Sequence, residues 1–148
     1  MKKLLLVLLS LICILPLAGC LKKEAINPDV FSQELENRGY SIDVIYDNYW
    51  ETGLRASNPE SNINFELFIF DSINTSKNRF INLKIKIDNI RSTKSVRTEI
   101  NGLNYNSYTL NNYSKYYYLV RVDERILYGN GDSDYKSEIK EIMKSLGY

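Results

Sequence analysis

The residue types that most often carry protein chemistry are scarce in this chain of 148 residues. It contains no histidine, and its two cysteines are Cys13 and Cys20. The absence of histidine removes the commonest general base and the commonest transition-metal ligand together. Acid–base or nucleophilic chemistry in the folded part would therefore depend on carboxylates, lysines, hydroxyls and tyrosines, and we expect no metal site and no cofactor.

Cys20 follows a short apolar segment at the start of the chain. Two lysines precede an apolar run over residues 4–17, and the small residues Ala18 and Gly19 lie directly before Cys20. A cationic start, an apolar stretch of about 7–15 residues and small residues at the cleavage point are the three parts of an export signal. The run is too short to span a membrane, which takes about 20 apolar residues.

The sequence Leu17-Ala18-Gly19-Cys20 resembles the lipobox of bacterial lipoproteins. This resemblance implies a diacylglyceryl thioether on Cys20, cleavage directly before it, and removal of residues 1–19. Two acyl chains hold a protein firmly on a membrane, so the expected location is the outer, extracytoplasmic face of the cell membrane. The alternative is an ordinary secretory signal in which Cys20 occurs by chance.

The organisation that follows is a signal peptide over residues 1–19, a lipidated tether over residues 20–26, and one domain over residues 27–148. The 19 basic residues of the whole chain, less the two lysines of the signal, leave 17 against 18 acidic residues. A nearly neutral domain lacks the basic surface that nucleic-acid binding requires, so nucleic acid is not an expected partner. Cys13 would leave with the signal, and no disulfide is then expected.

Two segments carry strong helix signals. Asn27 and Pro28 are typical of the start of a helix, and Gly39 is typical of its end. An apolar stripe over residues 135–146, followed by Gly147, predicts a last helix.

Between these helices the apolar residues alternate with period two, which predicts strands. Asn101-Gly102 is a strong signal for a two-residue hairpin turn. The predicted strands are residues 40–46, 50–56, 63–69, 96–100, 103–110, 116–122 and a segment from Ile126 onward.

Residues 73–90 fit two patterns. Ile81 and Ile85 alternate with polar residues as in a strand, whereas Ile73, Phe80 and Ile87 follow a helical stripe behind a possible cap. We prefer the helix, and the strand stays open. The predicted fold class is α+β, an antiparallel sheet of about six to seven strands with helices on one face, in the order α-βββ-α-ββββ-α.

This layout behind a lipobox resembles the small uncharacterised lipoproteins of low-GC Gram-positive bacteria. The resemblance depends on overall organisation and on the ending Ser145-Leu146-Gly147-Tyr148. It implies a location and carries no catalytic residue.

Two short patterns near the end of the chain match known sites in part. Oxygen-bearing residues at Asn130, Asp132, Asp134 and Glu141 have the spacing of a calcium loop, but Tyr135 stands where that loop needs glycine. Turns and helix caps need the same residues, and we interpret the run in that way.

The spacing Ser-x-x-Lys occurs at Ser133 and Lys136, and again at Ser137 and Lys140. It places a hydroxyl beside a lysine one helical turn away, as in penicillin-binding enzymes. The companion motifs of those enzymes are absent, so we attribute the spacing to a helix rich in both residue types.

An aromatic and amide-rich segment offers either a binding surface or an ordinary sheet. Sheet is the preferred interpretation, because alternating tyrosines are common strand formers. Tyr113, Tyr117 and Trp50 are the residues that would test a binding role first. The full set is Tyr105, Tyr108, Asn111, Asn112, Tyr113, Tyr116, Tyr117 and Tyr118, joined by Tyr49 and Trp50.

The leading hypothesis is a membrane-anchored, non-catalytic domain that binds an envelope protein or a wall polymer. One alternative is an immunity or inhibitor lipoprotein that protects its own envelope. Another is a glycan-acting enzyme, which would need two carboxylates such as Glu51 and Glu66 in one cleft.

Overall fold

The computed structural model describes residues 22–47 and 50–148. Residues 1–19, Cys20 and Tyr49 lie outside the described residues. The elements in chain order are α2 (Pro28–Glu36), β1 (Ser41–Asp47), β2 (Trp50–Ser57), β3 (Asn64–Ile69), α3 (Ile73–Asp88), β4 (Val96–Asn101), β5 (Tyr105–Asn111), β6 (Lys115–Val122), β7 (Arg125–Asp132), a short 3₁₀ helix η2 (Ser133–Tyr135) and α4 (Lys136–Ser145). No helix in these two ranges is long and apolar enough to cross a bilayer.

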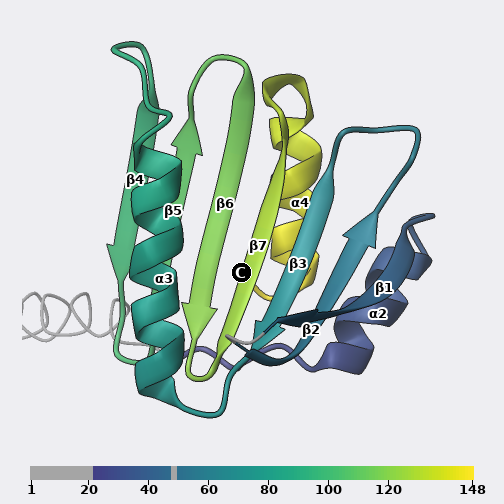
Figure 1. The fold of residues 1–148 in the computed structure, drawn as a ribbon. Helices are drawn as coiled ribbons and strands as arrows, with labels where there is room; N and C mark the ends of the chain where they lie inside the picture. Colours follow the sequence, from purple (N-terminus) through teal and green to yellow (C-terminus); the bar gives the residue numbers. More distant parts are fainter. Residues whose placement is uncertain (1–21, 48–49) are drawn as a thin grey trace, which may run out of the picture.

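All seven of these strands form one antiparallel sheet in the order β1-β2-β3-β7-β6-β5-β4 (Figure 1). The last strand, β7, lies between β3 and β6 and so joins the two sets of consecutive strands. The predicted α+β class with a large antiparallel sheet is therefore confirmed.

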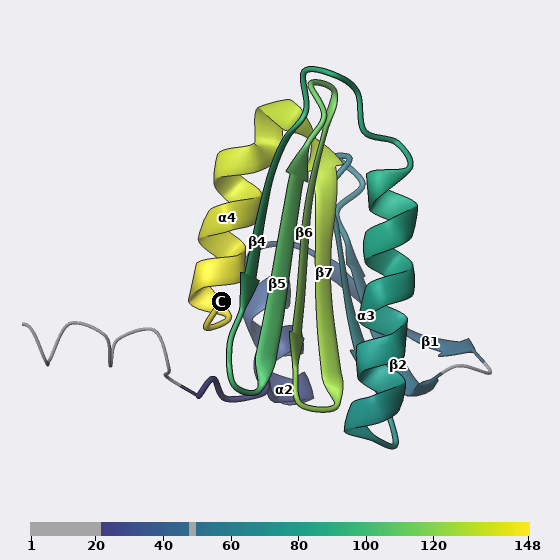
Figure 2. The same cartoon turned by 90° about the vertical axis from the view of Figure 1, so that its left-hand side faces the viewer.

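The helices cover both faces of the sheet. Helices α2 and α4 pack on one face and α3 packs on the other (Figures 1 and 2). The prediction of helices on a single face is wrong, because the central strands are apolar on both sides. On β6, for example, Val120 faces the α2 and α4 core while Leu119 faces the α3 core.

The local helix signals are confirmed. The Asn27 side chain accepts a hydrogen bond from the amide of Asp29 at 2.8 Å, and Gly39 ends the turn with φ +83°. Residues 73–88 are a helix, which settles the ambiguous segment, and the Ser72 side chain caps its start. The strand-like alternation arose because Ile81 and Ile85 are apolar but lie on the exposed side of α3.

The turn after β4 is longer than predicted. β4 ends at Asn101 and β5 begins at Tyr105, and the Gly102 amide donates to the Tyr105 carbonyl at 2.9 Å. A Cβ on Gly102 would lie 2.0 Å from the Tyr105 ring, so glycine is needed there for a close approach. The extra loop residue Asn104 is used elsewhere: its side chain bonds to Lys23 and to the Asp123 carboxylate.

Residues 22–26, which we call the N-terminal strap, are bound to the domain. The Lys23 amide donates to the Asn104 side-chain oxygen at 3.0 Å, and the Asn104 amide group donates back to the Lys23 carbonyl at 2.8 Å. The Ile26 amide donates to the Tyr148 hydroxyl at 2.8 Å, and Arg125 donates to the Ile26 carbonyl. The strap therefore leaves the domain at the end of the sheet where β4 ends and β5 begins, which we call the strap end.

Both hydrophobic cores consist of residues between Ile26 and Leu146. One core lies under α2 and α4, and the other lies under α3. A chain that begins at Lys22 therefore contains the complete described core together with the strap.

Replacing Tyr148 by Phe tests the strap. The change removes the hydroxyl that accepts from Ile26 and donates to the Glu24 carbonyl. We expect the free energy of unfolding in urea to fall by about 1–2 kcal/mol, because a partly buried amide loses its partner. Tyr113→Phe is the matched control, since Tyr113 is 81% exposed. Equal stability of the two variants would show that the strap is not held through Tyr148.

Candidate functional site

A concavity of about 380 Å³ lies between α3 and the edge of the sheet at β4 and β5, and we call it the α3–β4 groove. Its volume is within the range of about 300–1,000 Å³ that is usual for small-molecule sites. The lining residues are Lys77, Phe80, Ile81, Lys84 and Ile85 from α3, Glu99 and Asn101 from β4, and Asn106 from β5.

The spacing along α3 gives the groove an apolar wall. Phe80 is buried against the sheet, whereas Ile81 and Ile85 are 52% and 51% exposed. Residues four apart lie on the same side of a helix, so both isoleucines face the same solvent-filled space. Large apolar side chains left exposed beside polar ones are typical of a surface that contacts a ligand or a partner.

An ion pair between Lys84 and Glu99 lies in the middle of the groove. The Lys84 ammonium lies 2.5 Å from a Glu99 carboxylate oxygen and 5.6 Å from the centre of the Tyr108 ring. The Tyr108 hydroxyl donates to Asp88 at 2.5 Å, and burial together with that carboxylate raises the pKa of Tyr108 to about 12. The Tyr108 side chain is therefore held in place and stays uncharged beside the groove.

A buried positive charge, that of Arg121, lies at the strap end of the groove. Arg121 is 2% exposed and lies directly behind Asn106, to which its Nε donates at 2.8 Å. Its Nη1 donates to the Asp123 carbonyl at 2.9 Å. Burial lowers the pKa of its guanidinium without removing its charge, and the nearby carboxylates of Asp123 and Glu124 partly oppose that shift.

Two hydrogen-bonded asparagine side chains connect Arg121 with the groove. Asn106 accepts from Arg121 and donates to the Asn101 side-chain oxygen at 2.6 Å. Both asparagines line the groove, beside Lys77. Among the described residues Lys77 makes no ion pair, so this end of the groove favours a negative group.

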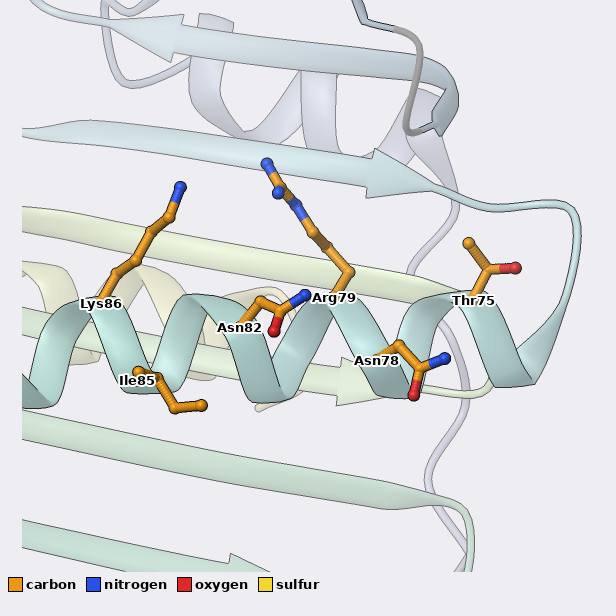
Figure 3. A pocket seen from close by; sticks show the side chains of 6 residues that line it. All are labelled: Thr75, Asn78, Arg79, Asn82, Ile85 and Lys86. Carbon is orange, nitrogen blue, oxygen red and sulfur yellow. The ribbon is translucent and has the colours of Figure 1, made fainter.

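A second concavity, of about 480 Å³, lies along the outer side of α3. Its described lining residues all come from that helix: Thr75, Asn78, Arg79, Asn82, Ile85 and Lys86 (Figure 3). Figure 3 shows Arg79 and Lys86 extending to one side of the helix and Ile85 to the other. One helix provides no described opposing wall, so the α3–β4 groove is the better candidate.

The aromatic and amide-rich segment is not one surface. Tyr108 and Tyr116 are buried on opposite faces of the sheet. Tyr117 stacks on Tyr128, with ring centres 6.5 Å apart, and Tyr113 is exposed at the turn between β5 and β6. The side chain of Trp50 lies outside the described part of the chain.

Three other sequence-derived candidates, Asp132, Ser133 and Lys136, make structural contacts. Asp132 belongs to β7, and its carboxylate contacts Lys115 at 2.6 Å and Asn62 at 3.1 Å. Of the Ser-x-x-Lys pairs, Ser133 donates to the Tyr113 carbonyl at 2.7 Å, and the Lys136 ammonium lies over the Tyr116 ring. Across residues 22–47 and 50–148 no group of three or more metal-ligating acidic or cysteine side chains occurs.

Glu66 is the one described member of the proposed carboxylate pair, because the side chain of Glu51 lies outside the described residues. Glu66 accepts from Arg55 at 2.8 Å, so its carboxylate is already paired. The sequence analysis did not predict the groove, because the exposure of Ile81 and Ile85 on α3 is known only from the structure.

No protein-family model matches the chain, and no curated protein sequence matches it. The fold is similar to that of a solved structure described as a GTP-binding regulator from Thermotoga maritima, with a TM-score of 0.51 and 14% sequence identity. The match covers 84% of this chain and 87% of that one. At this level of identity the similarity concerns the fold alone.

Replacing Arg121 by Met tests the buried charge. The change leaves the Asn106 side-chain oxygen and the Asp123 carbonyl without the donor they share. We expect a loss of about 1–3 kcal/mol in the free energy of unfolding. The matched control is Arg55→Met: Arg55 is 48% exposed and pairs with Glu66, so its loss should cost below about 1 kcal/mol. A smaller effect at Arg121 than at Arg55 would contradict the assignment.

Alkaline pH should destabilise the domain. Burial raises the pKa of Tyr40, Tyr108 and Tyr116 to about 12, from the ordinary value of 10.0. Between these pH values the unfolded chain releases protons that the folded chain retains, so the free energy of unfolding falls as pH rises. Urea titrations from pH 9 to about 12 should show this decline, and Tyr108→Phe should make it shallower. Constant stability across that range would refute the burial argument.

Proposed function

We propose that this chain is a lipid-anchored extracytoplasmic protein whose domain binds a ligand or partner without catalysis at the cell envelope. The observation that carries the proposal is the sequence Leu17-Ala18-Gly19-Cys20 at the end of an export signal. In this proposal the chain is one of the small uncharacterised lipoproteins of low-GC Gram-positive bacteria.

The position of the strap supports close attachment to the membrane. Lys23 is hydrogen-bonded to the domain, and Cys20 is three residues before it. A chain extends by at most about 3.6 Å per residue, so three residues reach roughly 11 Å. A diacylated Cys20 would hold the strap end of the sheet near the bilayer surface, and the rest of the domain would extend into the envelope.

The groove supports a binding role. Its wall is apolar, its central charges are paired with each other, and its strap end is positive. These features suit recognition of a ligand with an apolar part and a negative part. An envelope protein or a wall polymer remains the proposed class of larger partner, and the near-neutral charge gives no reason to expect nucleic acid.

Replacing Cys20 by Ser tests the anchor. In the producing bacterium we expect the native chain to lack residues 1–19, to carry a diacylglyceryl group on Cys20, and to sediment with membranes. The variant should lack the lipid, because only a thiol can form the thioether. Intact-mass spectrometry and membrane fractionation are the measurements.

Cys13→Ser is the matched control for this experiment, since Cys13 lies within the signal. It should leave the lipid and the location unchanged. A native chain that retains residues 1–19, or one that carries an unmodified Cys20, would refute the proposal.

A further inference from the structure

We propose that the α3–β4 groove binds one single-chain anionic amphiphile, with its acidic head at the strap end and its acyl chain along α3. The inference rests on the proposed binding role and names the ligand class for it.

The head site consists of Lys77, Asn101 and Asn106, backed by Arg121. Lys84 and Glu99 face the groove as a closed pair at 2.5 Å and cancel each other. Lys77 and Arg121 are positive, and the carboxylates of Asp123 and Glu124 act on Arg121 from behind the groove. The nearby carboxylate of Asp123 accepts from Asn104 at 2.9 Å, beside the strap.

A carboxylate or phosphate at this position would be bound by donors of two kinds. Lys77 supplies an ammonium, and the asparagine amides are oriented by their bonds to each other and to Arg121. Hydrogen bonds between charged partners are roughly twice as strong as neutral ones. Among the described residues Lys77 makes no ion pair, so an anionic head would supply the counterion that a neutral or cationic head could not.

The tail site is the exposed wall of α3. Phe80 is 4% exposed, so it offers an apolar floor and no free ring face for stacking a base or a sugar. Ile81 and Ile85 extend the apolar surface away from the head site. From Lys77 to Ile85 the helix rises about 12 Å, a distance that suits the first part of an acyl chain.

The source of the ligand is the bilayer. Asp123 connects the head site to the strap, because its carbonyl accepts from Arg121 and from Ser76 while its side chain accepts from Asn104. The head of the groove and the exit of the strap therefore lie at the same end of the sheet. A membrane holding Cys20 would supply the amphiphile at the open end of the groove.

The experiment uses the chain from Lys22 to Tyr148, which contains both cores and the strap and carries no lipid of its own. Isothermal titration with dodecanoate, below its micellar concentration, should give saturable binding of one molecule per chain. Dodecyltrimethylammonium, which has the same tail and the opposite charge, should bind at least about tenfold more weakly, a difference of about 1.4 kcal/mol.

Two pairs of variants locate the site. Lys77→Glu should weaken dodecanoate binding about tenfold, whereas Lys86→Glu, also an exposed lysine of α3 but outside the groove lining, should leave it unchanged. Ile81→Asp should abolish binding, and Ile90→Asp, at a residue 47% exposed and beyond the helix, should not. Circular dichroism identifies any variant that fails to fold. If Ile81→Asp fails to fold, the comparison of Lys77→Glu with Lys86→Glu decides whether the groove is the binding site.

Three results would each overturn the inference: no saturable binding of dodecanoate, equal binding of the cationic amphiphile, or unchanged binding by Lys77→Glu. The anchor is judged separately by the mass of Cys20. A diacylated Cys20 with no dodecanoate binding refutes the groove and leaves the anchor standing. Binding by the lipid-free chain together with an unmodified native Cys20 refutes the anchor and leaves the groove as a soluble-ligand site.

Discussion

The turn between β6 and β7 depends on one backbone carbonyl, that of Asp123. It accepts from the buried guanidinium of Arg121 and from the hydroxyl of Ser76, a side chain that is fully buried in the first turn of α3. A partly buried carbonyl that lost these donors would cost about 1–3 kcal/mol, so the two bonds fix α3 against the end of the sheet. The Asp123 carboxylate then holds Asn104, which holds the strap at Lys23. The width of the groove and the exit of the chain follow from this single turn.

The same constraint explains why the sheet needs two cores. Once α3 is fixed to one face, α2 and α4 cover the other, and the central strands are buried from both sides. Phe65 and Phe68 on β3 illustrate the result, since each belongs to a different core. The helices leave the outermost strand β4 with six exposed residues. The groove lies between α3 and this strand, and the described part of the chain leaves Ile81 and Ile85 about half exposed there.

Local signals in the sequence were sufficient for local structure. Asn27, Ser72 and Gly39 act within one turn of a helix, so their types alone predict where helices begin and end. The number of covered faces depends on which strands are neighbours, and β7 pairs with β3 only after residues 70–124 have formed other elements. Periodicity cannot contain that information. The error over helix placement came from reading the apolar runs of β6 and β7 as one-sided strands.

The candidate groove was also beyond local reasoning, because it joins residues near Lys77 with residues near Asn101 and depends on Arg121. The motif at Cys20, by contrast, is contiguous and was visible at once. The turn between β5 and β6 lies at the opposite end of the sheet from the strap, and Tyr113 there combines φ +78° with 81% exposure. β6 has eight residues, about 26 Å of extended chain. In a chain held through Cys20, this tyrosine-bearing tip would lie at the end of the sheet away from the membrane, where an antibody or a protease could reach it.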